Sequence, residues 1–67
     1  MAIVKVIEIM ADSEKSWSDA ANNAVKKASK SIKKIRTVWV KDQSATVKGG
    51  KITNYRVTVK LTFELDA

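Results

Sequence analysis

Polar and apolar residues alternate through the last third of the chain, Ile52 to Leu65, without a break from Asn54 onwards. The odd positions are apolar, namely Tyr55, Val57, Val59, Leu61, Phe63 and Leu65, and the even positions are polar, namely Asn54, Arg56, Thr58, Lys60, Thr62 and Glu64. Because successive side chains of a strand point to opposite faces, this pattern predicts one long β-strand with an apolar face and a polar face. A strand of this length implies a sheet that wraps over another element and leaves its polar face to water or a partner.

The start of the chain predicts a strand followed by a helix. Residues 2–10 are mostly β-branched and apolar, which favours a first strand, and residues 11–15 form a polar connection. Ser16 is the expected N-cap of the helix, because Asp19 follows three residues later in a variant of the capping box.

Helical spacing then continues from Trp17 to about Lys34. The apolar positions are Trp17, Ala20, Ala21, Ala24, Val25, Ala28, Ile32 and Ile35, and the opposite face is filled by asparagine and lysine. This spacing predicts an amphipathic helix, and its mostly alanine stripe allows the helix to lie close against a sheet. Trp17 begins the stripe and is therefore interpreted as a packing residue.

A second strand is predicted from Ile35 to Val47. Its apolar residues change parity near Asp42–Ser44, which indicates a β-bulge, and Gly49–Gly50 supplies the turn of a hairpin. The order is therefore β-α-β-β in a single domain over residues 1–67. A right-handed crossover makes the first two strands parallel, and the third strand fits antiparallel between them. The predicted fold class is α+β, with a three-stranded sheet of order 1-3-2 on one helix.

Composition limits the chemistry available to the chain. It has 67 residues, no cysteine and no histidine, so it has no disulfide, no thiolate metal site and no histidine base. A core this small supplies no more than roughly 3–5 kcal/mol, which makes an obligate homo-oligomer the expected source of further stability. The carboxylates show no spacing that forms an acid–base couple or a calcium loop. We therefore expect no enzymatic activity, no catalytic residue and no metal ligand.

The net charge of +6, from 13 Lys+Arg against 7 Asp+Glu, favours anionic partners or a solvated, lysine-rich surface. A nucleic-acid interface would use Lys26, Lys27, Lys30, Lys33, Lys34 and Arg36. No helix-turn-helix, zinc site or RNA-stacking signature accompanies them, so nucleic acid is not the expected partner. No apolar run approaches the ~18 residues of a membrane span, and the start lacks a signal-peptide pattern, so a cytoplasmic protein is expected.

The residues from Val4 to Leu65 resemble the dodecin family. The resemblance rests on VKVIEI, SWSDAANNAV, VKDQ and YRVTVKLTFEL, in that order and spacing. It implies the same β-α-β-β fold and a hollow homododecamer. It also implies that flavin, as riboflavin or FMN, binds in pairs between subunits with its ring stacked on a tryptophan.

Three residues are candidates for the flavin site that the resemblance implies. The family's stacking tryptophan falls at Thr37, which has no aromatic face, and its hydrogen-bonding glutamine falls at Arg56, which has no acceptor. Trp39 lies two residues beyond Thr37 on the same strand face and can supply the ring. Arg56 can pair with a flavin phosphate or stack on a ring. The alternatives are that Trp39 is an interface or sheet-surface residue, and that Arg56 forms an inter-subunit ion pair with Glu64, Asp42 or Glu8.

Two functions remain open at this point. The first is a non-catalytic cage that binds or stores flavin between subunits. The second is an assembly of the same shape that has lost flavin binding and holds another small ligand or an ion. In either case the polar face of the last strand faces a ligand, a partner or a water-filled lumen.

Overall fold

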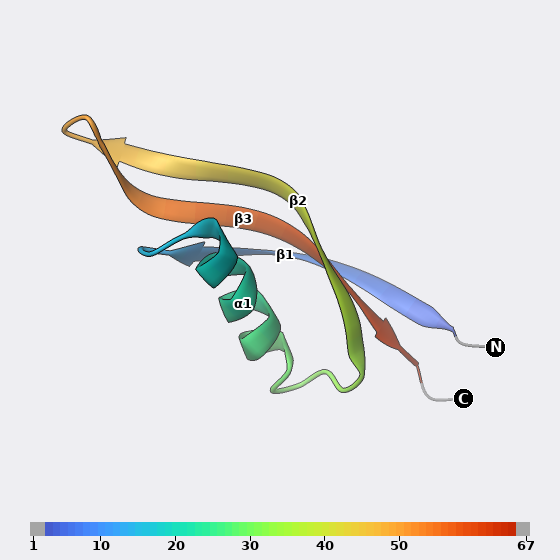
Figure 1. Ribbon diagram of the computed structural model, residues 1–67. Helices are drawn as coiled ribbons and strands as arrows, with labels where there is room; N and C mark the ends of the chain where they lie inside the picture. Colours follow the sequence, from blue (N-terminus) through green and yellow to red (C-terminus); the bar gives the residue numbers. More distant parts are fainter. Residues whose placement is uncertain (1–2, 66–67) are drawn as a thin grey trace.

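The computed structural model describes residues 3–65, which form a three-stranded sheet with a single helix on one of its faces (Figure 1). The elements are β1 (Val4–Ser13), α1 (Trp17–Ala28), β2 (Ile35–Lys48) and β3 (Lys51–Glu64). The strand order is β1-β3-β2, and β3 is antiparallel to both neighbours. The predicted α+β class, element order and sheet order are confirmed.

The core lies between β3 and α1. Val57, Val59 and Leu61 on the odd-numbered face of β3 are fully buried, as the alternating pattern predicts, and Ala20 and Ala24 meet them from the helix. The alanines let the helix backbone approach the sheet closely. Burying one such valine or leucine side chain contributes about 1.5–3 kcal/mol, so this small cluster is the main source of stability within one chain.

The helix begins where the sequence predicts. Ser16 is the N-cap, and its Oγ accepts a hydrogen bond from the backbone N of Asp19 at 2.9 Å. The Asp19 carboxylate does not complete a capping box with Ser16. It accepts a hydrogen bond of 2.6 Å from the buried Ser13 hydroxyl, whose oxygen in turn accepts from the Lys15 backbone N at 2.9 Å. Hydrogen bonds of the Ser13, Ser16 and Asp19 side chains thus stabilise the connection between β1 and α1.

The helix ends earlier than predicted, at Ala28 instead of about Lys34. The Ser29 hydroxyl donates to the Val25 carbonyl at 2.7 Å, and the next two backbone bonds are of the tighter i to i+3 kind. Lys34 then adopts φ +60°, which turns the chain into β2. Ile32 and Ile35, which continue the apolar spacing beyond the end of the helix, are half-buried. Their apolar character therefore serves packing and does not indicate further helix.

The first strand is longer than predicted at its far end. The sequence pattern places Ala11 and Asp12 in a polar connection, yet β1 runs to Ser13 and pairs these positions with β3. Backbone pairing across strands thus outweighs the polar composition of this segment. The predicted start at residue 2 lies outside the described residues.

The hairpin of β2 and β3 follows the sequence closely. The register shifts between Val40 and Asp42, beside the predicted bulge at Asp42–Ser44, and two further shifts occur towards the ends of the pairing. Gly49 and Gly50 form the turn with φ of +57° and +76°, as a two-residue type I′ turn requires. These irregularities twist and bend the long β2–β3 pair around the helix.

The sheet is much longer than the helix that covers it. Strands of 14 residues extend about 46 Å, whereas a 12-residue helix extends about 18 Å. The described chain measures 52 × 20 × 13 Å, and Figure 1 shows the tip of the β2–β3 hairpin projecting well beyond the start of α1.

Candidate functional site

The open face of the sheet, opposite α1, carries several rows of polar and charged residues that pair across the strands. We use the name open face for the even-numbered residues of β3 from Arg56 to Thr62 and the residues that pair with them. It comprises Arg56, Thr58, Lys60 and Thr62 of β3, Val6, Glu8, Met10 and Asp12 of β1, and Thr37, Trp39, Asp42 and Ser44 of β2. No helix or strand of the described chain covers this face, as Figure 1 shows.

One row across the open face contains the exposed tryptophan. Trp39 pairs with Lys60 on the central strand, and Lys60 pairs with Glu8 on the other side. The Lys60 ammonium lies 5.2 Å from the centroid of the Trp39 ring, within range of a cation–π interaction. Lys41 reaches from the bulge to the Glu8 carboxylate, with 3.6 Å between Nζ and Oε1. Trp39 is nevertheless 62% exposed, so a large part of its ring is free to contact a ligand or partner.

The neighbouring row contains Thr37. Its hydroxyl is hydrogen-bonded to that of Thr62, directly opposite on β3. Thr37 and Trp39 therefore lie side by side on the open face, on the same strand. The side chains of Thr37 and Thr62 thus lie in the row next to the exposed Trp39 indole.

Arg56 is held by a carboxylate of its own chain. Its Nε donates to Asp12 Oδ1 at 2.7 Å and its Nη2 donates to Oδ2 at 3.0 Å, a bidentate pair across β1 and β3. Hydrogen bonding from Arg56, reinforced by its charge and by Asn54, lowers the pKa of the Asp12 carboxyl against the opposing effect of desolvation. The same contact raises the pKa of the Arg56 guanidinium.

The three candidate residues do not converge within one chain. Arg56 lies four residues along β3 from Lys60, the partner of Trp39, which corresponds to about 13 Å of strand. The candidate residues therefore form two separate groups on the open face. One group is Thr37 with Trp39, and the other is Arg56 with Asp12. A ligand that contacts both groups extends along β3 or lies between two copies of the chain.

Sequence reasoning misses two of the interactions that organise this face, the pairing of Asp12 with Arg56 and that of Lys60 with Trp39. Both follow from the strand register, because each pair occupies directly opposed positions. Aligning the apolar faces of the strands fixes which residues share a face but not which residues pair, because registers shifted by two residues keep the same faces. Of the alternative inter-subunit partners considered for Arg56, Glu64 pairs with Arg36 at 3.2 Å and Glu8 with Lys41 at 3.6 Å within the same chain.

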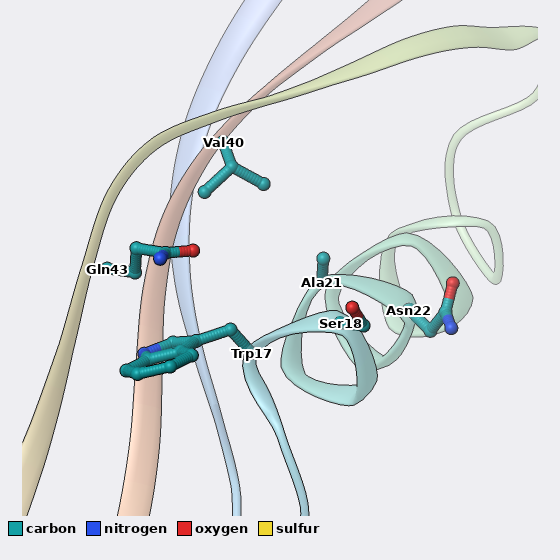
Figure 2. Close-up of a pocket in the computed structure, with 6 residues that line it drawn as sticks. All are labelled: Trp17, Ser18, Ala21, Asn22, Val40 and Gln43. Atoms are coloured by element: carbon teal, nitrogen blue, oxygen red, sulfur yellow. The ribbon is translucent and has the colours of Figure 1, made fainter.

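A shallow hollow of about 290 Å³ lies on the other side of the sheet, between α1 and β2. Figure 2 shows Val40 and Gln43 of β2 facing the first turns of the helix, with Trp17 at one end. Its lining is Trp17, Ser18, Ala21, Asn22, Val40 and Gln43, none of which titrates near neutral pH. The hollow therefore offers a neutral contact surface without acid–base chemistry.

Trp17 acts as the sequence predicts, as a packing residue. Its ring meets Tyr55 edge-on, with centroids 4.9 Å apart and planes at 76°, and its Nε1 donates to the Ser44 carbonyl at 2.8 Å. These contacts fix the start of α1 over β3 and β2. The indole is thus part of the fold and not a free ligand-binding ring.

Neither a metal cluster nor a membrane span is found in the part of the chain that the structure describes. No three or more Asp or Glu side chains within residues 3–65 gather closely enough to hold a metal ion. The only helix of these residues is too short to cross a membrane.

Comparison with known proteins identifies the family. Residues 3–66, almost the whole chain, match the family model described as Dodecin. The chain belongs to the dodecin family. The calcium dodecin of Mycobacterium tuberculosis is 39% identical to it over 66 residues, which cover 97% of this chain and 92% of the relative.

Solved dodecin structures superpose closely on this one. Dodecin from Streptomyces coelicolor has a TM-score of 0.92 at 26% identity, covering 98% of this chain and 94% of that one. The calcium dodecin structure, described as calcium-chelating with a novel calcium-binding site, has a TM-score of 0.81 at 37% identity, covering 96% and 91%. A Thermus thermophilus protein at 22% identity has a TM-score of 0.94, covering 100% and 98%, which supports the fold alone.

Three of the six carboxylates in residues 3–65 of this dodecin are paired with basic residues of the same chain. Glu8 is held by Lys41, Asp12 by Arg56 and Glu64 by Arg36. Glu14 and Asp42 have no ion pair or hydrogen bond with another side chain among the described residues. A cation site in this dodecin would therefore draw on these two carboxylates or compete with an existing ion pair.

Proposed function

We propose that this dodecin is a non-enzymatic, cytoplasmic homododecamer that binds riboflavin or FMN between its subunits, with Trp39 as the stacking ring. The observation that carries the proposal is the 62% exposed Trp39 on the uncovered sheet face, beside a lysine. A large exposed indole on a strand costs hydration free energy unless a partner covers it. A planar flavin ring matches it in size and stacking chemistry.

The residues around Trp39 suit a planar ligand with an anionic tail. Lys60 places a positive charge next to the ring, where the FMN phosphate gains more than the uncharged ribityl chain of riboflavin. Thr37 supplies a methyl group and a hydroxyl instead of the ring that the family pattern has at this position. Arg56 uses two of its five N–H donors on Asp12, so three remain for a phosphate or a carbonyl.

The separation of the two groups on the open face favours a site shared between subunits. On one chain, Arg56 lies about 13 Å of strand away from the position opposite Trp39. When two open faces meet, Trp39 of one copy and Arg56 of another can border the same ligand. This arrangement supports Thr37, Trp39 and Arg56 as the site residues.

A second candidate function is an assembly that has lost flavin binding and holds another small ligand or an ion. Two observations favour it: the 39% identical relative is a calcium dodecin, and the Arg56 charge is already balanced by Asp12. A cation would then be held by carboxylates of several subunits, with Asp42 and Glu14 as the ones without an ion pair or a side-chain hydrogen bond in residues 3–65.

The test is a titration of the purified protein with riboflavin and with FMN, followed by quenching of flavin fluorescence. We expect micromolar or tighter binding, and Trp39→Ala to weaken it more than tenfold, which equals about 1.4 kcal/mol. Trp39→Phe, the matched control, keeps a smaller ring and retains most of the affinity. Lys60→Met keeps the aliphatic stem and weakens FMN more than riboflavin.

Unchanged affinity in Trp39→Ala would refute the stacking role of that ring. If neither flavin is quenched, the second function takes precedence. Calorimetric titration with calcium then decides, because binding that is lost in Asp42→Asn or Glu14→Gln supports the ion-binding assembly.

A further inference from the structure

The excess positive charge of the chain is confined to one segment. Residues 20–41 contain seven Lys+Arg and no Asp or Glu, whereas the rest of the chain contains six Lys+Arg and seven Asp+Glu. The net charge of +6 therefore comes entirely from most of α1, the turns that follow it and the first half of β2. Figure 1 shows α1 and these turns on the helix side of the sheet, away from the open face.

Most of the lysines in this segment have no carboxylate to balance them. Arg36 is paired with Glu64, and Lys41 with Glu8, so the charges at the start of β2 are compensated within the chain. The basic residues before β2 differ, because four of them are exposed and have neither an ion pair nor a side-chain hydrogen bond in residues 3–65. These four are Lys26, Lys27, Lys30 and Lys33.

Three of these lysines border one shallow hollow of about 180 Å³ at the end of α1. Its lining is Asn23, Lys26, Lys27 and Lys30, which we call the lysine hollow. Lys26 and Lys27 belong to the last turn of the helix, and the backbone N of Lys30 donates to the Lys27 carbonyl at 3.2 Å just beyond it. Asn23 donates from its side-chain amide to the Asp12 carbonyl at 3.4 Å, so its position at the edge of the hollow is tied to β1.

The electrostatics of the lysine hollow favour an anion with several negative charges. Lys30 follows Lys26 by four residues and Lys27 by three, spacings at which like charges on a helix repel each other. The dipole of α1 offers only about half a negative charge at this end. No Asp or Glu of residues 3–65 lines the hollow. The chain thus leaves a repulsion that a bound anion relieves.

The size and lining of the hollow indicate which anionic group it accepts. A volume of about 180 Å³ is smaller than the about 300–1,000 Å³ of pockets that enclose organic ligands. The lining contains no aromatic ring on which a planar group could stack. Lysine is a flexible point charge with three donors, and it binds phosphate without imposing one orientation. The hollow therefore suits phosphate groups without an attached ring.

Two other phosphate-bearing partners match these residues less well. Nucleic-acid recognition relies on arginine forks and stacking rings, but both arginines of the chain are held by carboxylates, Arg36 by Glu64 and Arg56 by Asp12. An anionic membrane binds helices that also insert an apolar face, but the apolar stripe of α1 packs on the sheet. What remains is a chain of phosphates that requires charge alone.

We propose that the lysine hollow binds a linear polyphosphate anion, and that one long chain runs across the hollows of several copies of the protein. Each hollow contacts only a few phosphate groups, and the linkage between them raises the effective concentration at the next hollow. The site is separate from the open face and does not depend on flavin binding. It uses the proposed homo-oligomer only for the contact with several copies.

Calorimetric titration of the full chain with long-chain polyphosphate tests the hollow. We expect the variant that combines Lys26→Gln, Lys27→Gln and Lys30→Gln to bind more than tenfold more weakly than wild type. Replacing the same three lysines by arginine keeps their charge and should retain binding. An arginine variant that loses binding, or a glutamine variant that keeps the wild-type affinity, overturns the proposal.

The matched control removes the same charge elsewhere. It combines Lys15→Gln, Lys48→Gln and Lys51→Gln, three exposed lysines outside residues 20–41 that have no ion pair in residues 3–65. We expect it to weaken binding less than threefold. Equal losses in the two glutamine variants overturn the proposal, because net charge alone would then account for binding.

Competition at equal phosphate concentration identifies the ligand. We expect tripolyphosphate to bind at least tenfold more weakly than the long chain, because it cannot reach a second hollow. Duplex DNA or phosphatidylglycerol vesicles that displace the long chain as effectively as polyphosphate itself overturn the choice of ligand. Tripolyphosphate that binds as tightly as the long chain overturns the contact with several copies. A wild type that is monomeric by light scattering refutes the oligomer, whereas the glutamine variant titrated with tripolyphosphate still tests the hollow.

Discussion

At the scale of single residues, the open face is organised by opposite charges on facing strand positions. Asp12 and Arg56 form a bidentate pair, and Lys41 reaches Glu8 across the central strand. These pairs engage the long basic side chains with carboxylates of the same chain. Trp39 is left as the large exposed ring of this face, which is why the functional proposal centres on it.

The Asp12–Arg56 pair makes stability depend on pH in a defined direction. Arg56 lowers the pKa of the folded-state Asp12 carboxyl below its ordinary value of 3.8. A lowered folded-state pKa means that the pair stabilises the fold above pH 3.8 and that this contribution is lost as the pH falls through the folded-state value. We expect urea unfolding to show Asp12→Asn less stable than wild type at pH 7, with the difference vanishing in acid.

Asp42→Asn is the matched control, because Asp42 has no basic partner among the described residues. Its difference from wild type should stay small at every pH. A gap between Asp12→Asn and wild type that widens as the pH falls would contradict the direction of the pKa shift.

At the scale of elements, the hairpin turn depends on its glycines for backbone reasons alone. Gly49 has φ +57°, and a Cβ built there meets no atom within 4 Å. The cost of Gly49→Ala therefore comes from the left-handed conformation and amounts to about 1–2 kcal/mol. Gly49→Asn adopts this conformation readily and should lose little. Urea unfolding measures both, and an alanine variant as stable as the asparagine variant would contradict the account.

The pattern of side chains predicts the existence and order of all four elements, but two of their ends require tertiary information. The helix ends at Ala28 because Ser29 bonds back to Val25 and the chain must turn towards β2, although helical spacing continues to Ile35. The strand β1 reaches Ser13 because β3 offers backbone partners there, although the residues are polar. Residue spacing and composition are local properties of the sequence. Neither specifies which segment of the chain packs against a helix or pairs with a strand.

At the scale of the whole molecule, a long sheet is covered by a short helix. The buried core consists of two alanines, two valines and one leucine within the described residues, while large apolar side chains stay exposed at both ends of the sheet. A chain with so little interior needs other copies to cover these surfaces. The need for an oligomer follows from length and composition, whereas the number of twelve is implied by the dodecin family.

The candidate site is only partly predictable from the sequence. Strand alternation by itself places Thr37 and Trp39 on one face. The engagement of Arg56 by Asp12, and its distance of about 13 Å of strand from the Trp39 row, depend on the register and emerge only from the fold. In the proposed site, residues of two copies border one ligand, which a single sequence does not indicate.

The most direct test of the central claim is native mass spectrometry of the wild-type protein with FMN added. It reports the number of chains and the number of bound ligands in the same particle. We predict a twelve-chain assembly that carries FMN, and the same assembly without FMN when Trp39 is replaced by alanine. A wild-type assembly without bound FMN, or a monomer, would contradict the account.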